Sequence, residues 1–296
     1  MAVTYRIKNE VCMNQKKYST LFIVPALAVF TIFFLVPMVS SLFFSMTVWS
    51  FDSFKFCGFQ NFELFFTDDS LSIGIKNTLI YAVLTCGLKV ILAFLIAVFL
   101  TSKIITKNIL RSVVFFPNLV STIAVGITFS ALMHPSKGLI NKALEFIHIP
   151  AVDWLGNTHL ALFSVIGTDV WKGVGIATVI YIAGIQSIDK SYYEAASIDG
   201  ATGWEQLRYI TLPLVRPAMN SVIILSFIGG MRTFDLIWSM TGGGPGFATD
   251  VMASIIYKQY AAGYYGLSTA GNVIMFVLIA ALAYPLQKFL LSREVR

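Results

Sequence analysis

The chain has few charged residues. Asp, Glu, Lys and Arg make up 12% of its 296 residues, whereas hydrophobic residues make up 57%. Soluble globular domains carry about 25% charged residues. Because a larger core would still need a hydrated surface, this deficit excludes an ordinary soluble domain and predicts a surface that faces lipid. The 25 phenylalanines suit the same interpretation.

Cysteine and histidine are equally scarce. The chain has three of each, and neither set falls at the close spacing that zinc or redox motifs require. A Walker-type G-x-x-x-x-G-K-[ST] sequence is missing, and no nucleophile lies at a credible spacing from a base. We therefore expect no catalytic residue, no metal site and no cofactor bound by this chain. The net charge of +6 is not gathered into a basic patch, so we expect no nucleic acid partner.

Long apolar runs are what the sequence has instead. A membrane-spanning helix needs about 20 predominantly apolar residues. Six stretches meet this requirement: 21–46, 77–100, 112–132, 160–185, 217–238 and 267–290. The first is too long for the core of a signal peptide, so we interpret it as a retained span. The sequence therefore predicts an all-α membrane protein with about six transmembrane helices.

The distribution of Lys and Arg predicts the orientation of these spans. Cytoplasmic loops carry an excess of both residues. With a cytoplasmic N-terminus, thirteen Lys and Arg fall on the inner side, against five on the outer side. We therefore expect both termini in the cytoplasm, with residues 1–20 as a cytoplasmic segment and residues 21–296 as one transmembrane domain. Lys89, Lys172 and Arg232 fall within spans.

The loop after the fourth span, residues 186–217, has clear helix-start signals. Ser191 precedes Glu194 by three residues, and Thr202 precedes Glu205 by three. In such a capping box the hydroxyl accepts a backbone N–H of the first turn, while the Glu side chain reaches back to the first residue. The loop is therefore expected to contain two short helices, near residues 192–198 and 203–209.

A sharp turn is expected between these two helices. Gly200 can adopt the left-handed conformation that ends a helix, so we place the turn at Asp199 and Gly200. Pro213 and Pro217 then redirect the chain into the fifth span, because proline disrupts a continuing helix.

The first helix of the loop has the composition of a contact surface. Ala195 and Ala196 are small and allow another surface to approach closely. Tyr192, Tyr193 and Ile198 are large and would be exposed unless a partner covers them. Exposed apolar anchors of this kind usually mark a contact site. The alternative is an amphipathic loop that lies on the bilayer surface.

The order of residues in this loop is similar to a family motif. The loop resembles the EAA motif of binding-protein-dependent ABC importer permeases through Glu194-Ala195-Ala196, then Asp199-Gly200-Ala201, then Ile210-Thr211-Leu212-Pro213. In that family the loop is a coupling helix that docks in a groove of the cytoplasmic ATPase. The resemblance therefore implies an ATPase-coupling surface made of Tyr192, Tyr193, Glu194, Ala195, Ala196, Asp199, Gly200 and Ala201.

The resemblance extends over nearly the whole chain and points to the carbohydrate-uptake branch of this family. The matching positions are Asn77-Thr78, Arg111, Pro117, Trp171 and the run Thr241-Gly242-Gly243-Gly244-Pro245. Phe234-Asp235 before this run is similar to the first permease subunit of the maltose and glycerol-phosphate importers. The chain departs from the maltose member in lacking extra N-terminal spans and a large extracellular insertion, so we expect the minimal six-span form.

What the resemblance implies is a type I ABC importer permease fold that forms half of the translocation path of an ATP-driven sugar importer. It also implies a second homologous permease subunit in a heterodimer, two copies of an ATPase subunit that binds ATP and Mg, and an extracytoplasmic sugar-binding protein. The expected location is the bilayer of a bacterial or archaeal cell (inner) membrane, crossed several times.

Ionisable residues at mid-membrane depth mark a candidate path for the sugar, because they are costly there unless they have a function. Asp169 lies about 14 Å into the fourth span at about 1.5 Å per residue, near the bilayer centre. The fourth span has a polar face at helical spacing, and the fifth has one of small and polar residues. Family members carry substrate between the equivalent stretches, so we expect a path formed by Asp169, Trp171, Lys172, Gly173, Ile176, Ser226, Gly230, Thr233 and Asp235.

Other interpretations of these faces are open. Small residues at four-residue spacing also let membrane helices pack closely. Asp169 with Lys172, or Arg232 with Asp235, would suit a local ion pair. Lys89 suits either a structural pairing or a place in the path. The solute is open between sugars, polyols and glycerol phosphate, since the intramembrane cations also allow an anion.

A secondary transporter driven by an ion gradient is the alternative function. Such a carrier would use the intramembrane ionisable residues as a relay. It often shows paired internal repeats, which we do not find in the sequence, and it leaves the motif in loop 186–217 without an explanation.

Overall fold

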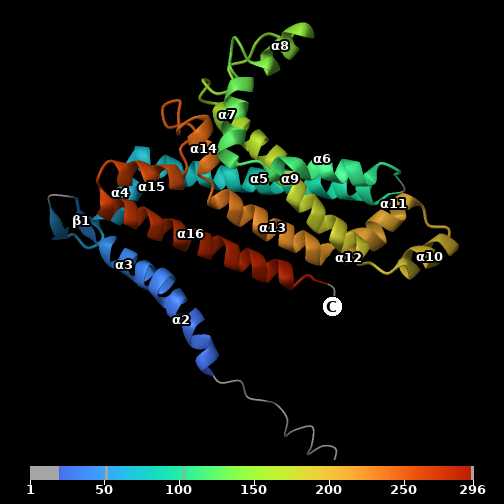
Figure 1. Ribbon diagram of the computed structural model, residues 1–296, viewed down its shortest axis with the longest axis horizontal. Helices are drawn as coiled ribbons and strands as arrows, with labels where there is room; N and C mark the ends of the chain where they lie inside the picture. Colours follow the sequence, from blue (N-terminus) through green and yellow to red (C-terminus); the bar gives the residue numbers. More distant parts are fainter. Residues whose placement is uncertain (1–19, 51–52, 103, 295–296) are drawn as a thin grey trace, which may run out of the picture.

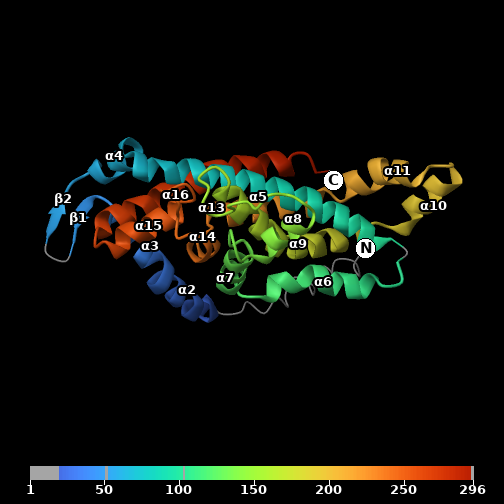
Figure 2. The ribbon, with the colours of Figure 1, turned by 90° about the horizontal axis from the view of Figure 1, so that it is seen from above.

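The computed structural model describes residues 20–50, 53–102 and 104–294, so the predicted cytoplasmic segment lies almost wholly outside the described residues. Four helices lie side by side along the long axis of the molecule (Figure 1) and remain together in the view from above (Figure 2). They are α5 (Asp69–Thr101), α9 (Ala161–Gln186), α13 (Arg216–Met231) and α16 (Tyr265–Leu291).

The described chain has four helices that could span a membrane, and six spans if each of two bent helix pairs is one span. Four are helices that are long and apolar enough to cross a bilayer: Leu21–Phe44, Asp69–Thr101, Ala161–Gln186 and Tyr265–Leu291. Two are bent pairs, α6 (Lys107–Leu119) with α7 (Thr122–Leu132), and Gly203–Leu214 with Arg216–Met231. The predicted all-α membrane class is confirmed, and each predicted span has a counterpart.

The first span leans away from the bundle (Figure 1). It consists of η1 (Thr20–Ile23), α2 (Val24–Phe30), the π-helical η2 (Thr31–Leu35) and α3 (Val36–Phe44). No residue of α2, η2 or α3 is buried within the chain, although α3 packs on α16. An apolar helix with no buried side chain needs lipid or another chain around it.

The central helix α5 begins earlier than predicted. The Asp68 carboxylate accepts a 2.8 Å hydrogen bond from the Ser70 N–H, which caps the helix. The helix therefore starts at Asp69 rather than near residue 77. Hydropathy marks only the part of a helix that suits lipid, so the two polar turns at its start were missed.

Small residues bring the central helices close together. Ala82, Ala93 and Ala97 of α5 have no exposed surface. Gly175 of α9 faces α6, where an added Cβ would lie 2.5 Å from the Val114 carbonyl oxygen. Small residues at such positions let membrane helices approach closely.

The third predicted span is broken rather than continuous. α6 and α7 meet at an angle of 97°, and Val120 between them has an extended backbone. Contacts with residues 239 and 240, which follow the predicted fifth span, hold α7 in its direction. Gly126 packs directly against Ser239, and the Ser130 hydroxyl donates to the Met240 carbonyl oxygen at 3.2 Å. The sequence predicted a span over 112–132 but not its bend, because these contacts are distant in sequence.

The fifth predicted span also breaks. α13 ends just after Gly229 and Gly230, and a new helix, α14 (Asp235–Met240), begins after a short irregular stretch. Glycine is the weakest helix former after proline. The sequence had predicted Ser226 and Thr233 on one face of a continuous helix. The structure places Ser226 within α13 and Thr233 in the break itself.

The end of the bundle opposite α10 is covered by short elements (Figure 1). A two-stranded antiparallel hairpin follows α3 and packs on α16, the Asn61 amide of the helix before α5 donates to the Thr47 carbonyl oxygen at 2.8 Å, and the helix before α16 packs on α16 and α5. These elements are β1 (Thr47–Trp49), β2 (Phe54–Phe56), α4 (Gln60–Thr67) and α15 (Met252–Ala261). α8 (Leu139–Phe146) projects from the side of the molecule beyond α7.

Candidate coupling and translocation sites

The first loop helix, α10 (Lys190–Ile198), lies at the end of the bundle with α11 (Gly203–Gln206) (Figure 1). It begins two residues before the predicted start. The Asp189 carboxylate accepts a 2.9 Å hydrogen bond from the Ser191 N–H and caps the helix. The predicted capping box of Ser191 and Glu194 was therefore wrong, because an earlier N-cap places Ser191 inside the first turn.

The C-terminal end of α10 has the predicted left-handed glycine. Gly200 has a φ of +80°. Its N–H bonds to the Ser197 carbonyl oxygen at 3.2 Å, and the Ala201 N–H bonds to the Ala196 carbonyl oxygen at 2.9 Å. This pair of hydrogen bonds is the Schellman arrangement, which satisfies carbonyls that the helix end would leave free.

The second capping box is confirmed. The Thr202 hydroxyl accepts from the Glu205 N–H, and the Glu205 carboxylate accepts from the Thr202 N–H at 2.7 Å. Helical backbone continues beyond the predicted limit of residue 209, through the π-helical η3 (Leu207–Thr211) and α12 (Leu212–Leu214). A 64° bend then leads into α13, as the nearby prolines predicted.

The exposed face of α10 carries only part of the predicted coupling set. Tyr192 is 56% exposed and Ile198 is 88% exposed, and Glu194 is exposed as well. Tyr193 instead is half-buried, and its hydroxyl lies 3.0 Å from the Thr211 hydroxyl. Adjacent residues on a helix point about 100° apart, so Tyr192 and Tyr193 cannot both face outward. Tyr193 ties α10 to the turn that leads into α13.

We expect the substitution Asp189→Ala to loosen α10. Hydrogen bonds from the Ser191 N–H and then the Ser191 hydroxyl lower the pKa of the Asp189 carboxyl. Because the folded pKa is lowered, the cap stabilises fully above the ordinary Asp pKa and stops stabilising as pH falls through the lowered value. The α10 peptide should exchange deuterium faster in the variant at pH 7, and the difference should vanish in acid.

Asp199→Ala is the matched control for this measurement. Asp199 is the C-cap residue of the same helix, where a negative charge opposes the helix dipole. Its removal should not speed exchange. Equal exchange in both variants would contradict the capping role of Asp189.

Within the bundle, Asp169 of α9 pairs with Lys89 of α5. The Lys89 Nζ lies 2.8 Å from the Asp169 Oδ2. The suggested local pair with Lys172 is not formed, and neither is the one between Arg232 and Asp235, among the ion pairs of the described residues. The sequence left Lys89 open between a structural pairing and a place in the path, and the structure shows the pairing.

A pocket of about 250 Å³ opens beside this ion pair, between α9 and α13. Three of the predicted path residues, Gly173, Ile176 and Ser226, line it together with Lys89. The two predicted faces therefore meet, although they come from helices that are distant in sequence. The remaining wall is mostly apolar and is formed by Ala177, Ile180, Val222, Leu225 and Gly229.

The other predicted path residues do not line this pocket. Trp171 is 45% exposed and packs on the Phe129 ring at 5.0 Å between ring centroids. Lys172 is half-buried. Gly230 is buried against α5, where an added Cβ would lie 2.7 Å from the Ala82 Cα.

The last two predicted path residues lie at and just after the break that follows α13. The Thr233 hydroxyl lies 3.5 Å from the Tyr81 hydroxyl, and Asp235 is exposed in the first turn of α14. Beside them, the Phe234 and Trp238 rings stack at 5.6 Å, with the Tyr257 ring 4.8 Å from Trp238. Such ring faces suit the apolar face of a sugar ring.

The glycine-rich run after α14 is a turn that binds the start of α5. Gly242, Gly243 and Gly246 have positive φ. The Asn77 side-chain amide donates to the Ala248 carbonyl oxygen at 3.1 Å and to the Asp250 carbonyl oxygen at 2.8 Å. Asn77, one of the positions that carry the family resemblance, thus contacts the segment that directly follows the motif run 241–245.

The buried carboxylate of Asp250 holds this turn together. It accepts from the Ser254 hydroxyl at 2.8 Å and pairs with the Lys258 Nζ at 2.6 Å. An added Cβ at Gly243 would overlap the Asp250 carboxylate. Glycine is therefore required there both by the backbone conformation and by the space.

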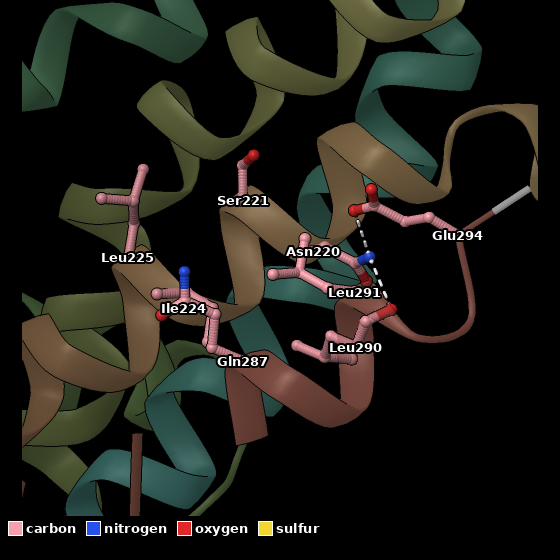
Figure 3. A pocket seen from close by; sticks show the side chains of 8 residues that line it. All are labelled: Asn220, Ser221, Ile224, Leu225, Gln287, Leu290, Leu291 and Glu294. Atoms are coloured by element: carbon pink, nitrogen blue, oxygen red, sulfur yellow. Dashed lines mark hydrogen bonds between the residues drawn. The ribbon is translucent and has the colours of Figure 1, made fainter. Parts of the chain in front are cut away.

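A second pocket, of about 310 Å³, lies between α13 and the C-terminal end of α16 (Figure 3). Asn220 in its wall donates to the Leu290 carbonyl oxygen at 3.2 Å and to the Glu294 Oε1 at 2.7 Å. These bonds close the end of α16, so Asn220 and Glu294 in this pocket serve helix capping.

Comparison with known proteins gives consistent family matches. The family model described as "Binding-protein-dependent transport system inner membrane component" matches residues 89–296. The trehalose/maltose transport system permease protein MalF of Thermococcus litoralis is 32% identical over 268 residues, covering 90% of this chain and 91% of that protein. The multiple sugar-binding transport system permease protein MsmF of Streptococcus mutans is 29% identical and covers 89% and 92%.

A solved structure shares the fold. A chain of a bacterial alginate ABC transporter, in complex with an alginate pentasaccharide-bound periplasmic protein, superposes with a TM-score of 0.79. It is 24% identical, with 91% of each chain covered. With six candidate spans, a family match over most of its length and relatives that align end to end, the chain belongs to the binding-protein-dependent transport system inner membrane components, the multi-pass permease subunits of ABC transporters.

Proposed function

We propose that this chain forms half of the translocation path of an ATP-driven sugar importer. The observation that carries the proposal is the pocket beside the Lys89–Asp169 pair, where the predicted faces of α9 and α13 meet. A small pocket with a few polar groups in an apolar wall is the usual form of a site for a small molecule. The names of the sugar-transporting relatives support a saccharide as the cargo.

Coupling to the ATPase is assigned to α10. We infer that Tyr192, Glu194, Ala195 and Ile198, the exposed face of this helix, dock on a separate cytoplasmic ATPase that binds ATP and Mg. The 88% exposure of Ile198 supports this, since a large apolar side chain at that position favours a protein partner. This assignment places the α10 end and both chain termini on the cytoplasmic side.

A movement of α10 would be transmitted to the pocket through hydrogen bonds between α10 and the helix that leads into α13. Tyr193 bonds to Thr211, and the Gln206 amide donates to the Ser197 hydroxyl at 3.1 Å. These bonds join α10 to the helix that bends into α13, and α13 forms one wall of the pocket. Closure of the ATPase would thus shift one pocket wall relative to α9 and give alternating access.

The assembly that we propose contains a second, homologous permease subunit, two ATPase subunits and an extracytoplasmic sugar-binding protein. The unburied first span and the projecting α7 and α8 favour a second membrane chain beside this one. The rival carrier driven by an ion gradient is less well supported, because the Lys89 ammonium already neutralises Asp169.

Affinity co-purification from the native membrane in mild detergent tests this function. Mass spectrometry should identify an ATPase and a second permease subunit with this chain, and the assembly should take up sugar in proteoliposomes when ATP is inside. Recovery of the chain alone across several detergents, with uptake that stops when proton or sodium gradients collapse, would favour the ion-driven carrier.

A further inference from the structure

The pocket between α9 and α13 has a cation in its wall but no net charge. Among the described residues that line it, Lys89 is the ionisable one. Its ammonium is neutralised by Asp169 at 2.8 Å. Elsewhere the lining is apolar apart from the Ser226 hydroxyl. A solute in this pocket therefore faces a compensated ion pair rather than a free charge.

Gly173 leaves space for the Lys89 side chain at the pocket wall. An added Cβ at Gly173 would lie 2.7 Å from the Lys89 Cε and 2.9 Å from its Nζ. Because the glycine leaves this slot open, the side chain of Lys89 passes α9 closely and reaches Asp169. The ammonium therefore has a defined position beside the pocket, and its side chain is 11% exposed.

The ammonium keeps hydrogen-bonding capacity toward the pocket. A lysine ammonium has three N–H donors. In the part of the chain that the structure describes, Lys89 Nζ makes one hydrogen bond, to Asp169. The other N–H groups can donate to a solute hydroxyl, which accepts without bringing a charge.

We propose that Lys89 is a specificity-determining residue that, neutralised by Asp169, selects uncharged saccharides over acidic ones. This inference rests on the proposed function. A sugar carboxylate would lose its hydration in a mostly apolar site and would approach the like charge of Asp169. The repulsion from Asp169 would offset the attraction of the sugar carboxylate to Lys89. Asp169 therefore disfavours the binding of acidic solutes. A neutral hydroxyl meets no such penalty.

The substitution Asp169→Asn tests this selection. It keeps the size of the side chain but leaves the charge of Lys89 uncompensated. The intact importer in nanodiscs, without its binding protein, would be examined by saturation-transfer NMR. The probes are maltose, trehalose and lactose as neutral disaccharides and digalacturonate as the acidic one. The wild type should favour the neutral probes, and the variant should shift toward digalacturonate by about tenfold or more.

The double substitution Lys89→Met/Asp169→Leu separates selection from a structural role. Replacing a buried ion pair by apolar residues of similar volume usually preserves folding. The double variant should assemble but lose most of its contact with the neutral probes. Unchanged binding of neutral probes by it would overturn the proposal and make the pair purely structural.

Two further outcomes would also overturn the proposal. One is equal binding of digalacturonate to the wild type and to Asp169→Asn, and the other is no signal from any probe. Uptake by wild-type proteoliposomes with the binding protein is measured in parallel. Sugar uptake together with either of these outcomes would leave the proposed function standing and remove only the role of Lys89.

Discussion

Replacing Gly200 by valine is expected to reduce ATP-driven sugar uptake by about tenfold or more while the chain stays in the membrane at its normal level. Gly200 has a φ of +80°. That conformation costs an L-residue about 1–2 kcal/mol, and a β-branched residue adopts it least readily. The two hydrogen bonds that close α10 depend on it. Valine should therefore unwind the end of α10 and displace its exposed face.

Gly203→Val is the matched control. No atom lies within 4 Å of an added Cβ at either glycine, so both variants place the same side chain in open space. Gly203 lacks the positive φ of Gly200 and begins α11. Gly200→Asn should recover most of the uptake, because asparagine tolerates the left-handed conformation.

The measurement is uptake and ATP hydrolysis in the same proteoliposomes, with the amount of chain determined by immunoblot. If Gly200→Val transports as well as Gly203→Val, the left-handed turn is not needed for coupling. If hydrolysis continues while uptake is lost, the loss lies in the connection between the ATPase and the path rather than in assembly.

Replacing Asn77 by leucine is expected to lower the stability of the whole bundle. Asn77 is 6% exposed and donates to the carbonyl oxygens of Ala248 and Asp250. Leucine would leave these acceptors without their donor, at a cost of about 1–3 kcal/mol for a buried group. For about 2 kcal/mol the melting temperature in detergent should fall by roughly 4–8 °C.

Asn272→Leu serves as the comparison for this variant. Asn272 also lies in a long apolar helix, but its amide donates to the Ser268 carbonyl oxygen of the same helix at 3.3 Å. Leucine there should change the melting temperature little. Fluorescence-detected size-exclusion chromatography after heating gives both values. Equal melting of the two variants would mean that the link between α5 and the glycine-rich turn contributes little to stability.

Local signals in the sequence were reliable where the cause is itself local. The turn at Gly200 and the capping box of Thr202 and Glu205 depend on neighbouring residues, and both formed as predicted. The capping box at Ser191 failed for a local reason, since Asp189 provides an earlier N-cap. Hydropathy located the four long spans and the two bent pairs, because the part of a helix that faces lipid must be apolar.

The breaks in the third and fifth spans were not predictable from hydropathy. Val120 at the first break lies between polar residues, Asn118 and Ser121, which a hydropathy average over the whole run 112–132 does not resolve. The position of the break is decided by contacts between α7 and α14, and α14 follows more than a hundred residues later in the chain. Hydropathy indicates whether a segment suits lipid or water. It carries no information on the direction in which neighbouring helices hold that segment.

The sequence by itself determined that this chain is an all-α membrane protein, where the exposed loop helix lies, and which face of the fourth span carries polar side chains. Only the tertiary structure decided which of those residues meet. Asp169 pairs with Lys89, eighty positions away, rather than with Lys172 on its own helix. Spacing along a helix reports which residues share a face, but only packing decides which face of another helix lies opposite. Gly173 leaves the space for that pairing, and this function of a glycine becomes visible only when its neighbour on α5 is in place.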